Sequence, residues 1–311
     1  MSTLLRGPIL WATERALVRQ IVTERPLGRR IAHRFVAGDD LEAGMRAARE
    51  LDRQGILAML DHLGENVSSA AQAAAAADSY IAALKRIRET PELGSNISIK
   101  LTQLGLDDSV DLCAENVERV LQVAAETEPG TLVMIDMEAR EYVDRTLDVY
   151  LALRERYPGT GVCLQSYLFR TAEDALRIAG PDATVRMAKG AYLEPPETAY
   201  QRLAEIRKNY ARVAATLLSK GSTVHFATHD ERLVEGARRL VHRAGVPRER
   251  YEFQMLYGVR RDLQARLVAQ GEPVRVYIPY GTEWYPYLTR RMAERPGNLW
   301  FFVSNLLRWR G

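Results

Sequence analysis

Short runs of hydrophobic and β-branched residues alternate with longer amphipathic stretches along most of the chain. In stretches such as Ser109–Glu126, apolar residues recur three and four positions apart and charges fall between them. This alternation is typical of parallel strands joined by crossover helices. The expected strands are Gly55–Leu60, Ile97–Leu101, Thr131–Asp136, Val162–Tyr167, Thr184–Gly190, Thr223–Thr228, Tyr251–Leu256 and Val274–Tyr280.

The number of these units indicates an α/β fold of the TIM type. Eight strand-helix units in about 250 residues match a (β/α)8 barrel, whereas a doubly wound sheet more often stops at five or six strands. The first 54 residues show helical patterns only, with breaks at Pro26 and Gly38. We therefore predict N-terminal helices over residues 1–54, packed on one catalytic barrel over residues 55–311, with a final helix over the barrel mouth.

Composition and charge are those of an ordinary globular protein. Of 311 residues, 47% are hydrophobic and 27% are charged, which excludes a disordered chain. The net charge of +3 gives no reason to expect a nucleic-acid partner. Two cysteines suit a reducing compartment, and charged residues interrupt the N-terminal segment where a signal peptide would be apolar. We expect a cytoplasmic protein, or one bound peripherally at the inner face of the membrane.

Polar residues concentrate where the expected strands end. In a TIM barrel, apolar side chains fill the interior and the carboxyl ends of the strands surround the active site. Any one polar residue at such a position could be a paired core or rim residue. Their occurrence on six strands together favours a pocket. They are Lys100, Asp136, Gln165, Arg186, Lys189, Thr228, His229, Tyr277 and Tyr280.

The segment after the last strand carries a second polar group. Tyr287, Arg290, Arg291 and Glu294 have helical spacing, so they project from one face of the final helix. Two guanidinium groups there could grip a carboxylate, since each binds one bidentately. The alternative is a solvated charged face with an ordinary Arg290–Glu294 pair. The five histidines lack metal-binding spacing, and we expect no metal site.

Two further segments each allow two interpretations. Leu218–Thr223, with Lys220 and Gly221, could contact a phosphate or form a helix C-cap. Asn298–Arg310 could pack across the barrel mouth or lie in a membrane interface, because it combines aromatic and cationic residues.

Several motifs in order resemble the proline dehydrogenases, including the dehydrogenase domain of the bifunctional proline-utilisation flavoenzymes. They span nearly the whole predicted barrel, and the double arginine with its flanking tyrosine and glutamate is specific to that family. The loop between Gly281 and Tyr287 is shorter than in the bifunctional members. The motifs are SIKLTQLG (Ser98–Gly105), VMIDME (Val133–Glu138), VCLQSYL (Val162–Leu168), VRMAKGAY (Val185–Tyr192), FATHD (Phe226–Asp230), FQMLYG (Phe253–Gly258) and YIPYGTEWYPYLTRRMAE (Tyr277–Glu294).

This resemblance implies a flavin-binding barrel that oxidises L-proline to Δ1-pyrroline-5-carboxylate, the first step of proline degradation to glutamate. Hydride would pass to N5 of FAD and the electrons to a membrane quinone, and a pyrroline-5-carboxylate dehydrogenase would act next. No G-x-G-x-x-G follows a strand, so FAD would not bind in the Rossmann manner.

The resemblance also assigns residues by motif match. Asp136 and Arg186 match catalytic positions, with Arg186 close to the flavin N5. The substrate carboxylate would be held by Lys100, Arg290 and Arg291, and the proline ring would be lined by Tyr277, Tyr287 and Leu256. The flavin-contacting positions would be Met137, Gln165, Lys189, Gly190, Ala191, Thr228 and His229, with Glu294 near the flavin or the arginines.

Two other functions stay open from the residues alone. Lys100 or Lys189, near strand ends, could form a Schiff base in a lyase or aldolase barrel. A barrel that binds a small anion without catalysis would need only the arginine helix. Both alternatives predict a protein without flavin absorbance.

Overall fold

The computed structural model describes residues 32–64, 67–126 and 130–288. Its eight strands pair in parallel and close in chain order into a barrel, which confirms the predicted (β/α)8 architecture. The last two strands have the predicted bounds, and the others begin or end one or two residues away. They are β1 (Leu57–His62), β2 (Asn96–Ile99), β3 (Val133–Ile135), β4 (Thr160–Gln165), β5 (Thr184–Ala188), β6 (Thr223–Ala227), β7 (Tyr251–Leu256) and β8 (Val274–Tyr280).

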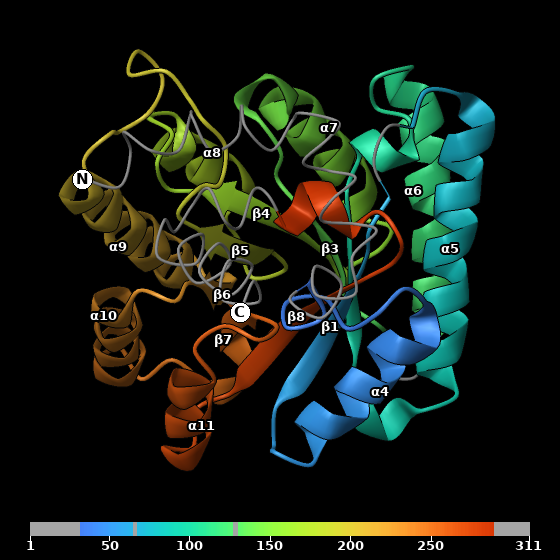
Figure 1. Cartoon of the computed structure of the whole chain (residues 1–311). Coiled ribbons are helices and arrows are strands. Elements are labelled where there is room, and N and C mark those ends of the chain that lie inside the picture. The colour runs from blue at the N-terminus through green and yellow to red at the C-terminus, as the bar shows by residue number, and fades with distance from the viewer. Residues whose placement is uncertain (1–31, 65–66, 127–129, 289–311) are drawn as a thin grey trace, which may run out of the picture.

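Helices surround the barrel on its outer face (Figure 1). Several begin at a residue whose side chain accepts a backbone N–H, as Ser69 and Ser109 do, which satisfies donors that a helix start leaves unpaired. The alanine-rich stretch is part of α5 and packs its smallest side chains on the strands. The helices are α4 (Leu41–Asp52), α5 (Ala70–Arg88), α6 (Val110–Ala125), α7 (Val143–Arg154), α8 (Thr171–Ile178), α9 (Leu203–Ser219), α10 (Glu231–Arg243) and α11 (Arg261–Ala269).

Helix α4 precedes the barrel in the chain but covers the seam between its first and last strands. It packs against both β1 and β8, the two strands that meet where the barrel closes. At Gly44, an added Cβ would lie 3.2 Å from Leu60 and from Tyr280, so glycine lets the helix approach both strands closely. Tyr280 therefore points outward to α4 and not into the pocket, which corrects its placement among the pocket residues.

A second, smaller hydrophobic cluster lies above the β8–β1 seam. It joins residues 32–36 to residues 284–288, the first turn of the helix after β8, with Leu63 between them. The N–H of Ala37 donates to Pro279 at 2.8 Å, and that of Gly281 donates to Gly38 at 2.9 Å. These bonds hold residues 37 and 38 against the end of β8, just before the helical turn at residues 284–288.

The barrel interior differs from the apolar filling that we expected. Strand side chains alternate between two faces, and the inward set on β2 and on β5 to β8 includes charged and amide groups. Their side chains lie deep in the barrel, with residues only 0 to 7% exposed: Ser98, Arg186, His225, Glu252, Gln254 and Arg275. Their polar atoms are paired with one another, which is what allows such groups to be buried.

Candidate active site

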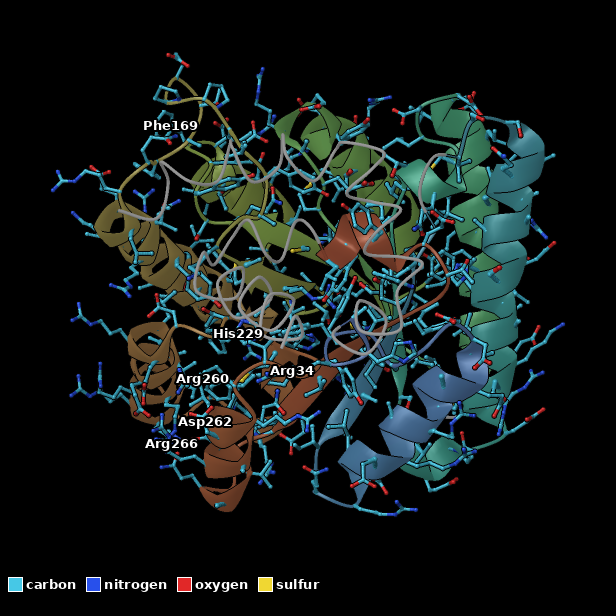
Figure 2. The ribbon with its side chains drawn as sticks, in the orientation of Figure 1. Arg34, Phe169, His229, Arg260, Asp262 and Arg266 are labelled. Atoms are coloured by element: carbon cyan, nitrogen blue, oxygen red, sulfur yellow. The ribbon has the colours of Figure 1, made fainter. Side chains whose placement is uncertain are left out.

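A cavity of about 420 Å³ opens at the carboxyl ends of the strands. It brings together the candidate site residues that the structure describes, apart from Tyr280 and the segment Leu218–Thr223, and His229 lies near the centre of the view in Figure 2. Arg290, Arg291 and Glu294, and the segment Asn298–Arg310, lie outside the described residues. The candidates that line the cavity are Lys100, Asp136, Met137, Gln165, Arg186, Lys189, Gly190, Ala191, Thr228, His229, Leu256, Tyr277 and Tyr287.

Lys100 lies directly after β2 and is held by Asp61 on the neighbouring strand. Its Nζ donates to Asp61 Oδ1 at 2.6 Å and lies 3.9 Å from Asp136 Oδ2. Burial alone would lower the pKa of Lys100, but the charges of Asp61 and Asp136 outweigh it and raise that pKa. The amine is therefore held as a cation that faces the cavity.

Asp136 joins three other groups on the cavity floor. Arg186 Nη1 and Ser98 Oγ both donate to its Oδ1, the latter at 2.8 Å, and the Tyr277 hydroxyl donates to its Oδ2 at 2.7 Å. The Arg186 guanidinium also lies over the Tyr277 ring, 5.3 Å from its centroid. Burial and the nearby carboxylates of Asp136 and Asp61 raise the pKa of Tyr277 well above its ordinary value, so the phenol stays protonated.

Asp61 is the site residue that the sequence interpretation missed. It is 0% exposed, and it is the carboxylate that fixes Lys100. The structure gives this role to Asp61 and leaves Asp136 to Arg186 and Tyr277. The available signal was a carboxylate directly after the apolar run that predicts the first strand.

Several cavity residues have a fixed polar orientation. His229 Nε2 accepts the backbone N–H of Leu256 at 2.9 Å, which leaves its Nδ1 to carry the proton of a neutral ring. Gln165 donates to the Met137 carbonyl at 3.2 Å, while its own buried Oε1 has no hydrogen-bond partner among the described residues. Gly190 has a φ of +117°, and a Cβ there would overlap the Tyr167 ring, so this position requires glycine.

The candidate phosphate segment Leu218–Thr223 lies at the other end of the barrel. Helix α9 ends at Ser219, Lys220 is its C-cap and Gly221 has a φ of +93°. The segment leads into the start of β6, whereas the cavity lies at the strand ends. The C-cap interpretation is therefore the correct one, and these residues do not contribute to the cavity.

The sequence pattern of the family described as proline dehydrogenase matches residues 44–302. A proline dehydrogenase of Deinococcus radiodurans is 38% identical over 99% of both chains. The chain belongs to the proline dehydrogenase family. This membership confirms the resemblance inferred from the motifs and makes the chain an oxidoreductase.

Other proline dehydrogenases and related structures agree. Proline dehydrogenase 2 of Bacillus subtilis is 36% identical over 91% of this chain and 92% of its own length. The crystal structure of proline utilization A from Bdellovibrio bacteriovorus, inactivated by N-propargylglycine, superposes with a TM-score of 0.78 at 23% identity. The match covers 85% of this chain and 32% of that longer one, and at this identity it supports the fold alone.

The described parts of this family member contain neither a membrane-spanning helix nor a cluster of metal ligands. No helix there combines the length and apolar character needed to cross a bilayer. No three His, Cys, Asp or Glu side chains among the described residues are grouped as a metal ion would require.

Proposed function

We propose that this chain oxidises L-proline to Δ1-pyrroline-5-carboxylate, with FAD bound in the cavity and a membrane quinone as the final electron acceptor. The observation that carries the proposal is the hydrogen-bonded network of Lys100, Asp136, Arg186 and Tyr277 on the cavity floor. It places a fixed cation for a carboxylate beside a fixed guanidinium, in a chain whose relatives are proline dehydrogenases.

The cavity residues fit a flavin. The buried, unpartnered Oε1 of Gln165 would accept an N–H from a bound ring, and the imide edge of a flavin carries one. Bound FAD would supply an acceptor for two electrons at N5. The residues proposed to hold it are Met137, Gln165, Lys189, Gly190, Ala191, Thr228 and His229. Glu294, outside the described residues, is proposed to join them.

Substrate binding would rely on charge that takes no part in the reaction. Lys100, kept protonated by Asp61, would meet the proline carboxylate together with Arg290 and Arg291. Such remote binding energy positions the C5–H bond. The ring would pack between Leu256, Tyr277 and Tyr287, which all line the cavity.

Asp136 and Arg186 would act together. Both Asp136 oxygens accept hydrogen bonds from Arg186, Ser98 or Tyr277, so this carboxylate holds the groups around the reacting centre. The fixed charge of Arg186 would favour the negative charge that the acceptor gains on reduction. The proline amine must lose its proton before or during the reaction, to a group or water beside this network.

The Schiff-base alternative has no support in the geometry. A lysine nucleophile must be neutral, and Asp61 at 2.6 Å keeps Lys100 charged. Lys189 lies 3.6 Å from Asp230, which likewise favours its cationic form.

Residues 1–54 would form helices packed on a catalytic FAD-binding barrel of residues 55–311. A cytoplasmic protein of this kind would meet its quinone as a peripheral protein at the inner membrane face, and its product would pass to a pyrroline-5-carboxylate dehydrogenase. Sedimentation with anionic, quinone-bearing vesicles at low salt tests the membrane contact, and a protein left wholly in the supernatant would contradict it.

The decisive experiment is spectroscopic. We expect purified protein to be yellow, to release FAD on denaturation, to bleach anaerobically with L-proline and to regain colour with a quinone. A colourless protein that borohydride traps with a ketone or aldehyde would support the lyase instead. A colourless protein that neither reacts with proline nor is trapped by borohydride would support the third alternative, a barrel that binds a small anion without catalysis.

The carboxylate assignment has its own test. Arg290→Ala or Arg291→Ala should raise the Michaelis constant for proline steeply, because losing one partner of a buried charged pair costs about 2–5 kcal/mol. Lysine should not replace either arginine, since an ammonium lacks the planar fork. Unchanged proline kinetics in both alanine variants would remove the assignment.

A further inference from the structure

At the cavity wall, Gln254 of β7 supports Arg186. Arg186 Nε donates to Gln254 Oε1 at 2.7 Å, and the two residues are 5% and 4% exposed. The rest of the guanidinium meets Asp136, Ser98 and the sulfur of Met59. Gln254 is therefore the neutral acceptor that fixes the Nε end of this side chain.

The orientation of the Gln254 amide is set from below. Its Nε2 donates to Glu252 Oε1 at 2.6 Å and lies 3.0 Å from His225 Nδ1. Glu252 as a carboxylate only accepts, whereas Arg186 only donates. Only one rotation of the amide satisfies both neighbours, so Glu252 determines that the oxygen faces Arg186.

Glu252 in turn is held as an anion. Arg275 Nε donates to its two oxygens at 2.9 and 3.1 Å, and Arg275 Nη1 donates to the Ala58 and Gly94 carbonyls. Burial would raise the pKa of Glu252, but Arg275 and His225 overcome it and lower that pKa to about 2. A continuous series of hydrogen bonds thus runs from the cation Arg275 through the anion Glu252 and the neutral amide of Gln254 to the cation Arg186.

We propose that Gln254 is a positioning residue for Arg186, and that Glu252, fixed by Arg275, sets the orientation of the Gln254 amide. The groups at the bottom of the barrel thereby hold the guanidinium at the cavity floor. The inference rests on the proposed function for its kinetic readout. Its geometric part rests only on the contacts of the buried side chains.

The first test removes the acceptor. Gln254→Leu should lower kcat by about 10- to 100-fold, because a small displacement of a positioned group has effects of that size. The Michaelis constant for proline should change much less, since the proposed contact of Lys100 with the proline carboxylate does not involve Gln254. The midpoint potential of the bound flavin should fall, because a displaced Arg186 favours the reduced form less.

The control removes a buried amide elsewhere. Asn116 on α6 is also 4% exposed, and its amide donates to the Leu104 carbonyl, outside the barrel. Asn116→Leu should lower the unfolding free energy. It should leave both kcat and the flavin potential at their wild-type values. A loss of kcat in both variants at equal folded fraction would show a merely structural role and overturn the proposal.

The second test exchanges the two side chains. Gln254→Glu alone puts two carboxylates in contact and should impair kcat and stability. Adding Glu252→Gln lets the new amide donate upward to residue 254 and accept from Arg275, so every donor again meets an acceptor. We expect the double variant to recover most of the kcat and the flavin potential that Gln254→Glu loses.

The outcomes separate this inference from the proposed function. Wild-type protein that proline does not bleach would refute the proposed function, whatever the variants do. Wild type that bleaches while Gln254→Leu keeps its kcat and flavin potential would refute the positioning role alone. A double variant no better than Gln254→Glu would refute the orienting role of Glu252.

Discussion

Two groups of charged residues in this protein form similar ion pairs, but one group is buried and the other is exposed to solvent. Inside the barrel, Arg275 and Glu252 are 7% exposed and are bonded at 2.9 Å. Outside it, Arg266 on α11 pairs with Glu231 on α10 at 2.5 Å, with side chains 41% and 50% exposed. Figure 2 shows Arg266 together with Arg260 and Asp262 at the outer edge of the molecule.

The setting, and not the number of contacts, decides what each group contributes. The outer residues Arg260, Asp262, Arg266 and Glu231 are solvated whether or not they pair, so their bonds are worth little. The inner pair has lost its water and depends on its partner, so breaking it leaves a buried charge without compensation. The inner group therefore fixes geometry, whereas the outer group mainly covers a surface.

The largest effect should come from breaking the inner pair. Arg275→Met leaves Glu252 as a buried carboxylate beside an apolar group, and should lower the unfolding free energy by about 3–5 kcal/mol. Urea denaturation measures it. Adding Glu252→Met removes the unpaired charge and should restore part of the loss. A single variant as stable as wild type would contradict the contrast between the two regions.

An intermediate effect should appear as a pH dependence. Burial lowers the pKa of His225 from 6.5 to about 4. The positive charges of Arg275 and Arg186 also lower this pKa, whereas the negative charge of Glu252 raises it. In the unfolded chain His225 binds a proton more readily than in the folded protein. The unfolding free energy is therefore highest above pH 6.5 and falls as the pH drops toward 4. The loss should reach about 3 kcal/mol.

A variant isolates this contribution. His225→Gln keeps an acceptor for the Gln254 amide but cannot titrate. Its unfolding free energy, measured in urea between pH 7 and 4.5, should fall less steeply than that of wild type. Equal slopes for the two proteins would assign the pH dependence to other groups.

The smallest effect should come from the outer group. Arg266→Ala removes its bonds to Glu231 and Glu235 and should change the unfolding free energy by less than about 1 kcal/mol. High salt should reduce even this difference, because it screens exposed charges. A loss comparable to that of Arg275→Met would show that exposure does not govern these pairs.

The sequence predicts the architecture well because the signals are local. The bounds predicted for β7 and β8 from their hydrophobic runs are correct, and polar residues near strand ends mark the cavity. The motif Tyr277–Glu294, which is part of the resemblance to the family, continues beyond the described residues. Features that depend on neighbouring residues in the chain, such as strand bounds and polar strand ends, can therefore be predicted from the sequence alone.

The interior network was not predicted, because it depends on closure of the barrel. Glu252 and Gln254, or Arg275 and Tyr277, alternate with apolar residues, and this period of two was the signal for an inward polar face. The expectation of an apolar interior concealed it. Which carboxylate meets Lys100 depends on the pairing of β1 with β2, where Asp61 lies opposite Ser98. No spacing along the chain specifies that neighbour.

Helix α4 has a consequence for the order of events during synthesis. It leaves the ribosome before any strand, yet one of the two strands it covers, β8, is made after all the others. Until Val274–Tyr280 emerges, the apolar side of α4 has only β1 to cover and the ring of strands stays open. A nascent chain that stops short of β8 therefore exposes a strand edge and a helix face together, a combination that invites aggregation.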